Sequence, residues 1–378
     1  MQKEKFHNDL FNLVSRIRLS EPLEIGWKMQ YHISKVWEMC HFDQMHILVT
    51  GSGNNYPAAL FAKHSCADSF RTANVEAICT QDAIKKFKQF KHIVNCDYHV
   101  EYDVVIIISY EGPTNDVRKI YDECMMSSSK PEIVILTGQR EDCFDSKIYQ
   151  NAKIFSYYNP EDLSGTEEST VSSFSTFISC AIFDDFQSSI PSTEDNVEAL
   201  MKSMEEAAKM DMNKIAYSIF MTPVVYVICE WDTMSVAYDI KNKFEKAGLA
   251  FVNICNKREF SQNADMWLSK TPGLIINLMR YQFAIQMDTK KAVNLDKTDY
   301  ETALKNFVKC YAEENCIPYL EIGSPAMMPM QCCMESMAMF LYVFAGIWNA
   351  YTAYENPEGI PLVNMELFDK MQSYEGDF

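Results

Sequence analysis

The stretch VVIIISYEGPTND, residues 104–116, decides the fold. Five consecutive β-branched apolar residues lead into Ser109, and hydroxyl groups, a glycine and an acidic side chain follow. Runs of this kind favour a buried strand. In open parallel sheets, ligands bind beyond the carboxyl ends of the strands, so the loop after Ser109 is expected to hold a ligand. Glu111, in the middle of that loop, places a negative charge there.

The rest of the chain alternates strand and helix patterns around this stretch. Strands are expected in the segments HILVTG, NVEAIC, PEIVILTG and AKIFSYY, and later in PVVYVICEW, AFVNIC, PGLIINLM and IPYLEIG. Helical spacing of apolar residues lies between them, as in NDVRKIYDECM and SVAYDIKNKFEKAGL, and also over residues 21–41, 164–188 and 298–315. Strands that alternate with helices predict an α/β fold whose parallel sheets are covered by helices on both faces.

The pattern occurs twice, which predicts two domains. A chain of 378 residues has room for two cores. The polar segment QSSIPSTEDN separates the halves, so we place the boundary near residues 187–197, with domains over 1–190 and 191–378. The last helix, expected over 330–355, is more apolar than a surface helix. Its Glu335 favours burial between domains or in a dimer interface over membrane contact.

Charge and composition narrow the class of partner. The formal charge is −18, from 34 basic and 52 acidic residues, which disfavours nucleic acid and anionic membrane surfaces. A small anionic ligand stays compatible, because backbone N–H groups and helix N-termini can bind it. The 13 cysteines lie mostly in apolar patterns without C-x-x-C pairs, as expected for reduced thiols in a cytoplasmic protein without a metal site.

Three segments resemble the sugar isomerase (SIS) domain. They are GSGNNY (residues 51–56) after a strand, SYEGPT (109–114) at the end of a later strand, and TVSSFST (170–176) at a helix start. The resemblance implies two SIS domains with flavodoxin-like sheets, as in amino-sugar isomerases, fructosamine-6-phosphate deglycases and the isomerase module of glucosamine-6-phosphate synthase. It also implies a homodimer that acts without a cofactor.

The ligand site implied by these segments is rich in hydroxyl and amide groups. Helix N–H groups and hydroxyls can hold a phosphate with little cationic charge. The expected substrate-binding residues are Ser52, Asn54, Asn55, Ser109, Tyr110, Glu111, Gly112, Thr114, Ser172 and Ser173. The alternative for residues 109–114 is a plain turn in which Thr114 caps a helix.

The sequence departs from the SIS pattern at the second loop and at the catalytic positions. Glu111 replaces a serine, and a carboxylate there repels a phosphate dianion. Either the ligand binds differently, or hydroxyls or an amine replace its anionic group. All seven histidines lie within the first 99 residues, so none takes the place of the ring-opening histidine of the second half.

Two glutamates are the candidates for proton transfer. Glu259 stands at the acidic position of the segment that matches the histidine region, and Glu245 lies one residue from the position of the family's glutamate. The alternatives are a loop acid for Glu259 and a solvated helix face for Glu245.

These observations favour a phosphosugar enzyme: an isomerase, deglycase or deaminase that acts on a 6-phosphorylated amino sugar or a sugar–amine adduct. The alternative is a non-catalytic sensor or regulatory protein that binds a sugar phosphate. A nucleotide-binding protein ranks last, because GSGNN lacks both the P-loop and the full dinucleotide motif.

Overall fold

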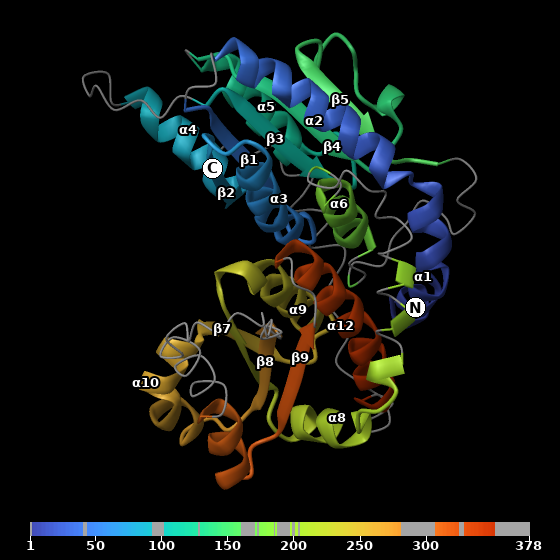
Figure 1. The fold of residues 1–378 in the computed structure, drawn as a ribbon, viewed down its shortest axis with the longest axis vertical. Helices are drawn as coiled ribbons and strands as arrows, with labels where there is room; N and C mark the ends of the chain where they lie inside the picture. Colours follow the sequence, from blue (N-terminus) through green and yellow to red (C-terminus); the bar gives the residue numbers. More distant parts are fainter. Residues whose placement is uncertain are drawn as a thin grey trace, which may run out of the picture. The chain divides into compact units, whose positions relative to one another are not determined.

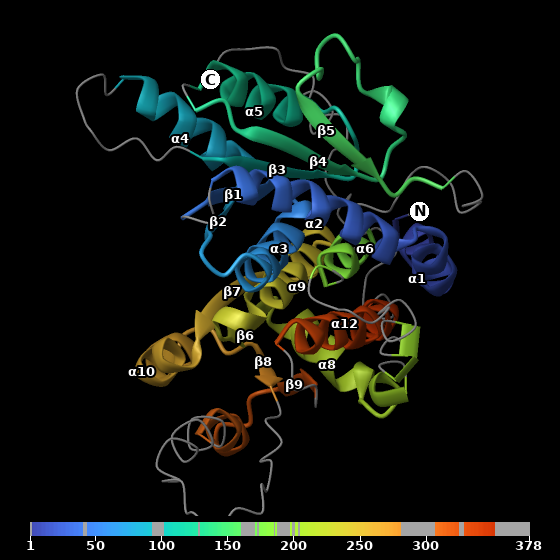
Figure 2. The same ribbon diagram turned by 45° about the horizontal axis from the view of Figure 1, so that its top comes forward.

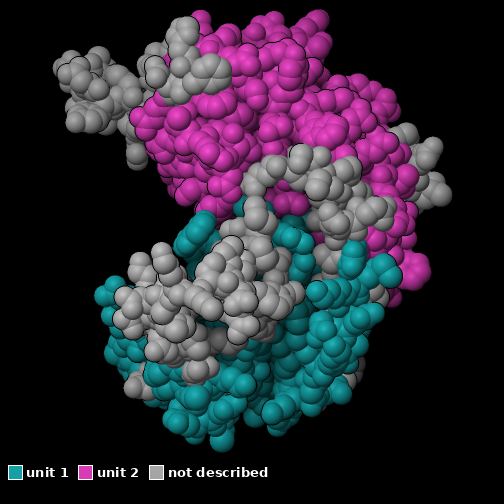
Figure 3. Space-filling model, in the orientation of Figure 1, with its two compact units in different colours: residues 1–3, 198–356 teal, residues 4–197, 357–378 magenta. Residues whose placement is uncertain are grey.

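The computed structural model describes residues 2–40, 44–92, 102–127, 129–159, 171, 174–184, 186, 197–198, 201–202, 205–280, 307–324 and 329–351. The chain divides into two compact units, coloured separately in Figure 3. We call residues 4–197 with 357–378 the N-terminal unit, and residues 198–356 with 1–3 the C-terminal unit. Each unit is described by itself.

A five-stranded parallel sheet forms the centre of the N-terminal unit (Figure 1). Its strands are β1 (His46–Gly51), β2 (Asn74–Cys79), β3 (Val104–Ser109), β4 (Glu132–Thr137) and β5 (Ala152–Ser156). Their order is β2-β1-β3-β4-β5, and every neighbouring pair is parallel. All six residues of β3 are buried, as expected for a β-branched run at the middle of a sheet.

Helices cover both faces of this sheet. The helices are α1 (Gln2–Leu19), α2 (Pro22–Met39), α3 (Asn55–Ser69), α4 (Thr80–His92), α5 (Asn115–Met126) and α6 (Phe174–Asp184). Figure 2 shows α4 and α5 on one side of the sheet and α2, α3 and α6 on the other. Contacts between elements agree, because α4 packs with α5, while α6 packs with α2 and α3.

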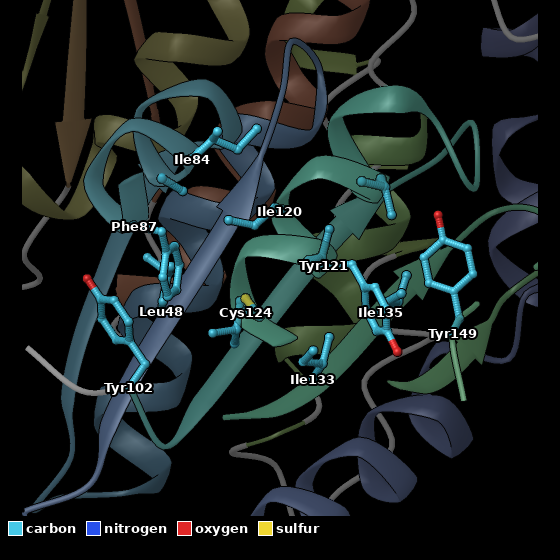
Figure 4. Packing of buried hydrophobic residues seen from close by; sticks show 14 of the residues in the cluster. Leu48, Ile84, Phe87, Tyr102, Ile120, Tyr121, Cys124, Ile133, Ile135 and Tyr149 are labelled. Atoms are coloured by element: carbon cyan, nitrogen blue, oxygen red, sulfur yellow. The ribbon is translucent and has the colours of Figure 1, made fainter. Parts of the chain in front are cut away.

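The core under α4 and α5 shows how the sheet positions the loops at its edge (Figure 4). Leu48 of β1 and Ile107 of β3 pack against helix residues that include Phe87, Ile120 and Cys124, all of them buried. Burial of apolar side chains contributes roughly 25 cal/mol per Å². The ends of β1 and β3 are therefore anchored by a well-packed layer, and the loops that follow start from a fixed frame.

The C-terminal unit repeats the plan with four parallel strands. They are β6 (Val224–Cys229), β7 (Phe251–Asn256), β8 (Leu274–Arg280) and β9 (Tyr319–Ser324), in the order β7-β6-β8-β9. On one face, α12 (Pro329–Tyr351) packs with both α8 (Met212–Met221) and α9 (Met234–Lys246). On the other face, α10 (Lys257–Leu268) and the helical residues 307–314 share a core with the sheet.

Helix α12 is buried by its own unit. It packs against β8, β9, α8 and α9, and its Gly346 lies directly against the side chain of Met212. By length and composition α12 alone among the described helices could cross a membrane, yet 72% of its apolar window is buried. The elements that cover α12 belong to the same domain, whereas the sequence suggested a neighbouring domain or subunit.

The predicted fold class is confirmed: both units are three-layer α/β structures with parallel sheets, and the N-terminal order is that of flavodoxin-like folds. Helix α2 and every predicted strand are present. Helices α1, α8 and α10 were not predicted. The expected helix ends at residues 164–170, 172–173 and 352–355 lie outside the described residues.

Candidate functional site

The candidate site lies where the N-terminal sheet changes direction. From β1 the chain moves outward to β2, and from β3 it moves to β4 on the opposite side, so the connections diverge between β1 and β3. Gly51 of β1 pairs with Ile108 of β3, which places the two strand ends side by side. We call residues 52–54 the first loop and residues 110–114 the second loop. Such a switch point is where open α/β sheets bind ligands.

The first loop turns tightly into α3. A side chain on Gly51 would place its Cβ 2.6 Å from the carbonyl oxygen of Asn55, so the turn requires a glycine. The N–H groups of Asn55 and Tyr56 donate to the carbonyls of Ser52 and Gly53 at 3.0 and 3.2 Å, and Pro57 has no N–H. The first turn of α3 therefore uses its own donors.

The second loop is also closed by internal bonds. The Ser109 hydroxyl donates to the Gly112 carbonyl at 2.8 Å, and Gly112 adopts a φ of 84°, in the left-handed region that favours glycine. Thr114 caps α5 by accepting from the N–H of Val117 at 3.4 Å. Thr114 therefore has the capping role that the sequence offered as the alternative to ligand binding. The hydroxyls expected to grip a ligand stabilise the loop in this structure.

Asn55 joins the two loops. Its amide is buried, with 4% of the residue exposed. The Oδ1 atom accepts from the N–H of Tyr110 at 3.3 Å, and Nδ2 donates to the Glu111 carboxylate at 3.5 Å. The ring of Tyr110 lies against the backbone of Gly138. The neutral amide of Asn55 therefore orients the carboxylate of Glu111 by donating to it, while Glu111 stays exposed to solvent.

Two further residues reach the loops that the sequence did not assign to the site. The Ser52 hydroxyl donates to the Asp116 carboxylate at 3.4 Å, and the Thr176 hydroxyl of α6 donates to the carbonyl of Asn54. The sequence signal that could have assigned Asp116 to the site is its position as an acid in the first helical turn after the second loop. The TVSSFST segment pointed to Thr176, whereas its predicted members Ser172 and Ser173 lie outside the described residues.

The charge of the site is negative. Residues 51–56 and 109–116 contain two carboxylates and no lysine, arginine or histidine. Arg118, on the next turn of α5, donates to Asp122 at 2.8 Å. Among the described residues, no group of three or more histidine, cysteine or acidic side chains is placed to hold a metal ion.

The two predicted catalytic glutamates lie on helices at opposite edges of the C-terminal sheet. Glu245, half-buried near the end of α9, accepts from the N–H of Val252 at 3.3 Å and lies 3.8 Å from Lys241. Val252 is the second residue of β7, so Glu245 lies at the amino edge of the C-terminal sheet, opposite the ligand edge. Glu245 is half-buried, whereas the alternative from the sequence was a position on a solvated helix face.

Glu259 lies at the carboxyl edge of the same sheet. It is exposed in the first turn of α10, a helix rather than the loop considered from sequence, and its N–H donates to Asn256 at 2.8 Å. Beside it, Lys257 lies 3.9 Å from Glu230, which follows β6. This edge therefore carries an exposed acid next to a weak ion pair.

No known protein family matches the sequence, and no curated protein matches it. Solved structures do resemble it. Tagatose-6-phosphate ketose/aldose isomerase from Escherichia coli aligns with a TM-score of 0.61 at 10% identity, over 95% of this chain and 96% of that one. Glucosamine-6-phosphate deaminase from Thermotoga maritima aligns at 0.56 and 11%, over 94% and 98%.

A third relative in structure is the C-terminal domain of glucosamine-fructose-6-phosphate aminotransferase from Francisella tularensis. It aligns with a TM-score of 0.56 at 10% identity, over 92% of this chain and 95% of that one. At such identities the likeness concerns the fold. The chain has the fold of phosphosugar isomerases over nearly its whole length.

Proposed function

We propose that the protein binds a carbohydrate derivative at the two loops of the N-terminal unit, within a double-SIS architecture of domains over residues 1–190 and 191–378. The observation that carries the proposal is the pair of loops at the switch point, joined through the buried Asn55. Their exposed and half-buried polar groups, from Ser52 to Glu111, suit a polyhydroxylated ligand. The fold of the structural relatives supports the same ligand class.

The enzymatic form of the proposal is an isomerase, deglycase or deaminase that acts on a 6-phosphorylated amino sugar or a sugar–amine adduct. Such reactions move a proton between adjacent carbons, which needs a group that both takes and gives a proton. Glu259 is our candidate for this group, because it is exposed at the carboxyl edge of its sheet.

A non-catalytic sensor or regulatory protein is the second candidate. The placement of Glu245 favours it, because that carboxylate is engaged by a backbone N–H at the amino edge. No histidine follows residue 99, so the chain also lacks the usual proton carrier in its second half.

Ligand-dependent stability and turnover, measured together, separate the two. The purified protein is incubated with fructose 6-phosphate, glucosamine 6-phosphate and a fructosamine 6-phosphate adduct, while thermal shift and product mass are followed. Turnover that falls by about 100-fold in Glu259→Gln supports the enzyme. Glu314→Gln, a change at an exposed acid of the same unit, serves as the control and should keep full activity.

Stabilisation without product supports the sensor. If no carbohydrate, phosphorylated or free, shifts the melting temperature, the ligand class itself is wrong.

We also propose a cytoplasmic homodimer. The support is the sequence resemblance to SIS proteins, whose sites are built at subunit contacts. Because α12 is covered by its own unit, its apolar surface no longer argues for a dimer. Size-exclusion chromatography with light scattering at two concentrations gives the mass directly, and a monomer at both would contradict the proposal.

A further inference from the structure

The donors that would hold a phosphate are occupied within the site. Phosphate binding without metal or lysine needs free hydroxyl and N–H groups that converge on one point. Here the hydroxyl of Ser109 donates to the carbonyl of Gly112, and the N–H of Thr114 donates to the same carbonyl at 2.9 Å. The N–H of Tyr110 donates to Asn55. A phosphate would have to break these bonds before it gained its own.

The donors of the first loop are engaged in the same way. The first two N–H groups of α3 donate to the carbonyls of residues 52 and 53, and the third residue of the helix is Pro57. The Ser52 hydroxyl donates to Asp116. These hydroxyl and N–H donors of both loops are therefore engaged within the protein.

The charges at the loops also disfavour the binding of a phosphate. Glu111 carries an exposed carboxylate that the buried amide of Asn55 orients, and Asp116 follows in the first turn of α5. The neighbouring cation, Arg118, is paired with Asp122, and Lys119 is exposed beyond it. A dianion near the exposed carboxylate of Glu111 is repelled, whereas a cation there gains that carboxylate as a partner.

We infer that the second loop receives a protonated amine of the sugar ligand and discriminates against a phosphate dianion, with Glu111 as the residue that determines this specificity. The inference rests on the carbohydrate binding proposed above, and it replaces the 6-phosphorylated ligand by one that brings an amine and no phosphate to this loop. Glu111 accepts the hydrogen bond of the ammonium, and Asn55 holds the carboxylate toward it.

The test compares three sugars that differ by one group. Glucosamine carries the amine, glucose lacks it, and glucosamine 6-phosphate adds the dianion. Dissociation constants are measured by calorimetry at low and at physiological salt. For the wild-type protein we expect glucosamine to bind about tenfold more tightly than either glucose or glucosamine 6-phosphate, with the preference reduced by salt.

Two variants at Glu111 locate the effect. Glu111→Gln removes the charge and should reduce the preference for glucosamine by about tenfold. Glu111→Ser restores a hydroxyl and should tighten the binding of glucosamine 6-phosphate. The matched control is Glu38→Gln, an identical charge change at an exposed position near the end of α2, and it should leave all three constants unchanged.

The outcomes separate this inference from the proposed function. Tighter binding of glucosamine 6-phosphate than of glucosamine, unaltered by Glu111→Ser, would overturn the inference and leave carbohydrate binding intact. Equal affinity for glucose and glucosamine would also overturn it. If none of the three sugars binds, the proposed function is wrong, and the inference falls with it.

Discussion

The two units share a strand order but treat the turn after their first strand differently. In the N-terminal unit β1 leads through Gly51 and an exposed glycine into α3, and Asn54 caps the helix without a side-chain hydrogen bond. In the C-terminal unit β6 leads into Glu230 and Thr233, whose side chains cap each other's backbone N–H groups. The β1 turn is closed by backbone hydrogen bonds, and the β6 turn is closed by the side chains of Glu230 and Thr233.

This difference teaches that the sheet supplies a place for a site and the loop decides whether one is built. Both units bring two strand ends together at a switch point. In the N-terminal unit the buried amide of Asn55 joins the two loops, whose polar side chains are half-buried or exposed. At β6 the corresponding groups satisfy one another, and Trp231 lies 63% exposed between them. Function therefore follows the loop residues and not the fold.

Exchange of the residues that end the first strands should give the largest effect. Gly51→Cys gives β1 the last residue of β6, and its Cβ would collide with the carbonyl of Asn55. We expect a loss of about 2–4 kcal/mol in the free energy of unfolding, together with loss of sugar binding. Urea unfolding and calorimetry measure the two effects.

The reverse exchange is the control. Cys229→Gly removes a buried side chain and adds backbone freedom, so it should cost about 1–2 kcal/mol and leave sugar binding unchanged. Equal losses for the two variants would mean that the β1 turn has no special need of glycine.

Removal of the caps should give an intermediate effect. Thr233→Ala takes away the acceptor for the N–H of Glu230, at 3.0 Å, and should cost about 1 kcal/mol. Asn54→Ala removes a side chain that makes no capping bond and should change the free energy of unfolding by less than about 0.5 kcal/mol. Thermal unfolding of both variants decides the matter. A larger loss for Asn54→Ala would show that the two turns are stabilised alike.

The smallest effect is expected at the third residue of the edge strands, where β2 has Glu76 and β7 has Asn253. Partial burial by itself would raise the pKa of Glu76, but hydrogen bonds from Lys86 and from Tyr102 outweigh it and lower the pKa below the usual value of 4.5. A lowered pKa contributes stability above about pH 4.5, and this contribution is lost as the pH falls through the folded-state pKa.

Glu76→Asn should therefore be less stable than the wild type at pH 7, by at most about 1 kcal/mol, because 38% of the Glu76 side chain is exposed. The difference should shrink as the pH falls below about 4.5, where the unfolded carboxyl protonates. Melting temperatures of both proteins from pH 3 to pH 7 give the curve. A constant difference across that range would exclude the ionised carboxylate as its source.

Much of the fold could be predicted from the sequence, because strand signals were strong and local. The β-branched run of β3 and the apolar segments of the other strands each identify a buried strand without reference to the rest of the chain. The misses were three helices with weak patterns, α1, α8 and α10. Helix α1 is rich in polar residues, and α8 has only ten residues, so its spacing covers fewer than three turns.

The site could be predicted only as a pair of loops. The bond between Asn55 and Glu111 joins residues 56 positions apart, and no local pattern encodes which side chains will meet. The edge at which Glu245 lies follows from the topology. A crossover helix returns the chain to the amino edge of a parallel sheet, so a residue near the end of that helix lies away from the ligand edge. The spacing of residues in the sequence does not show at which edge Glu245 lies, whereas the order of the strands does.

The packing of α12 against α8 has a consequence for how the C-terminal unit assembles. These helices are more than 100 residues apart in the chain, yet Gly346 meets Met212 and Tyr351 meets Phe220. During synthesis, β6 to β8 leave the ribosome well before α12, so the part of the sheet face that α12 covers stays exposed until that helix is made. Long-range closure of this kind slows folding and exposes the chain to aggregation. The C-terminal unit should therefore complete its core only after α12 has been made.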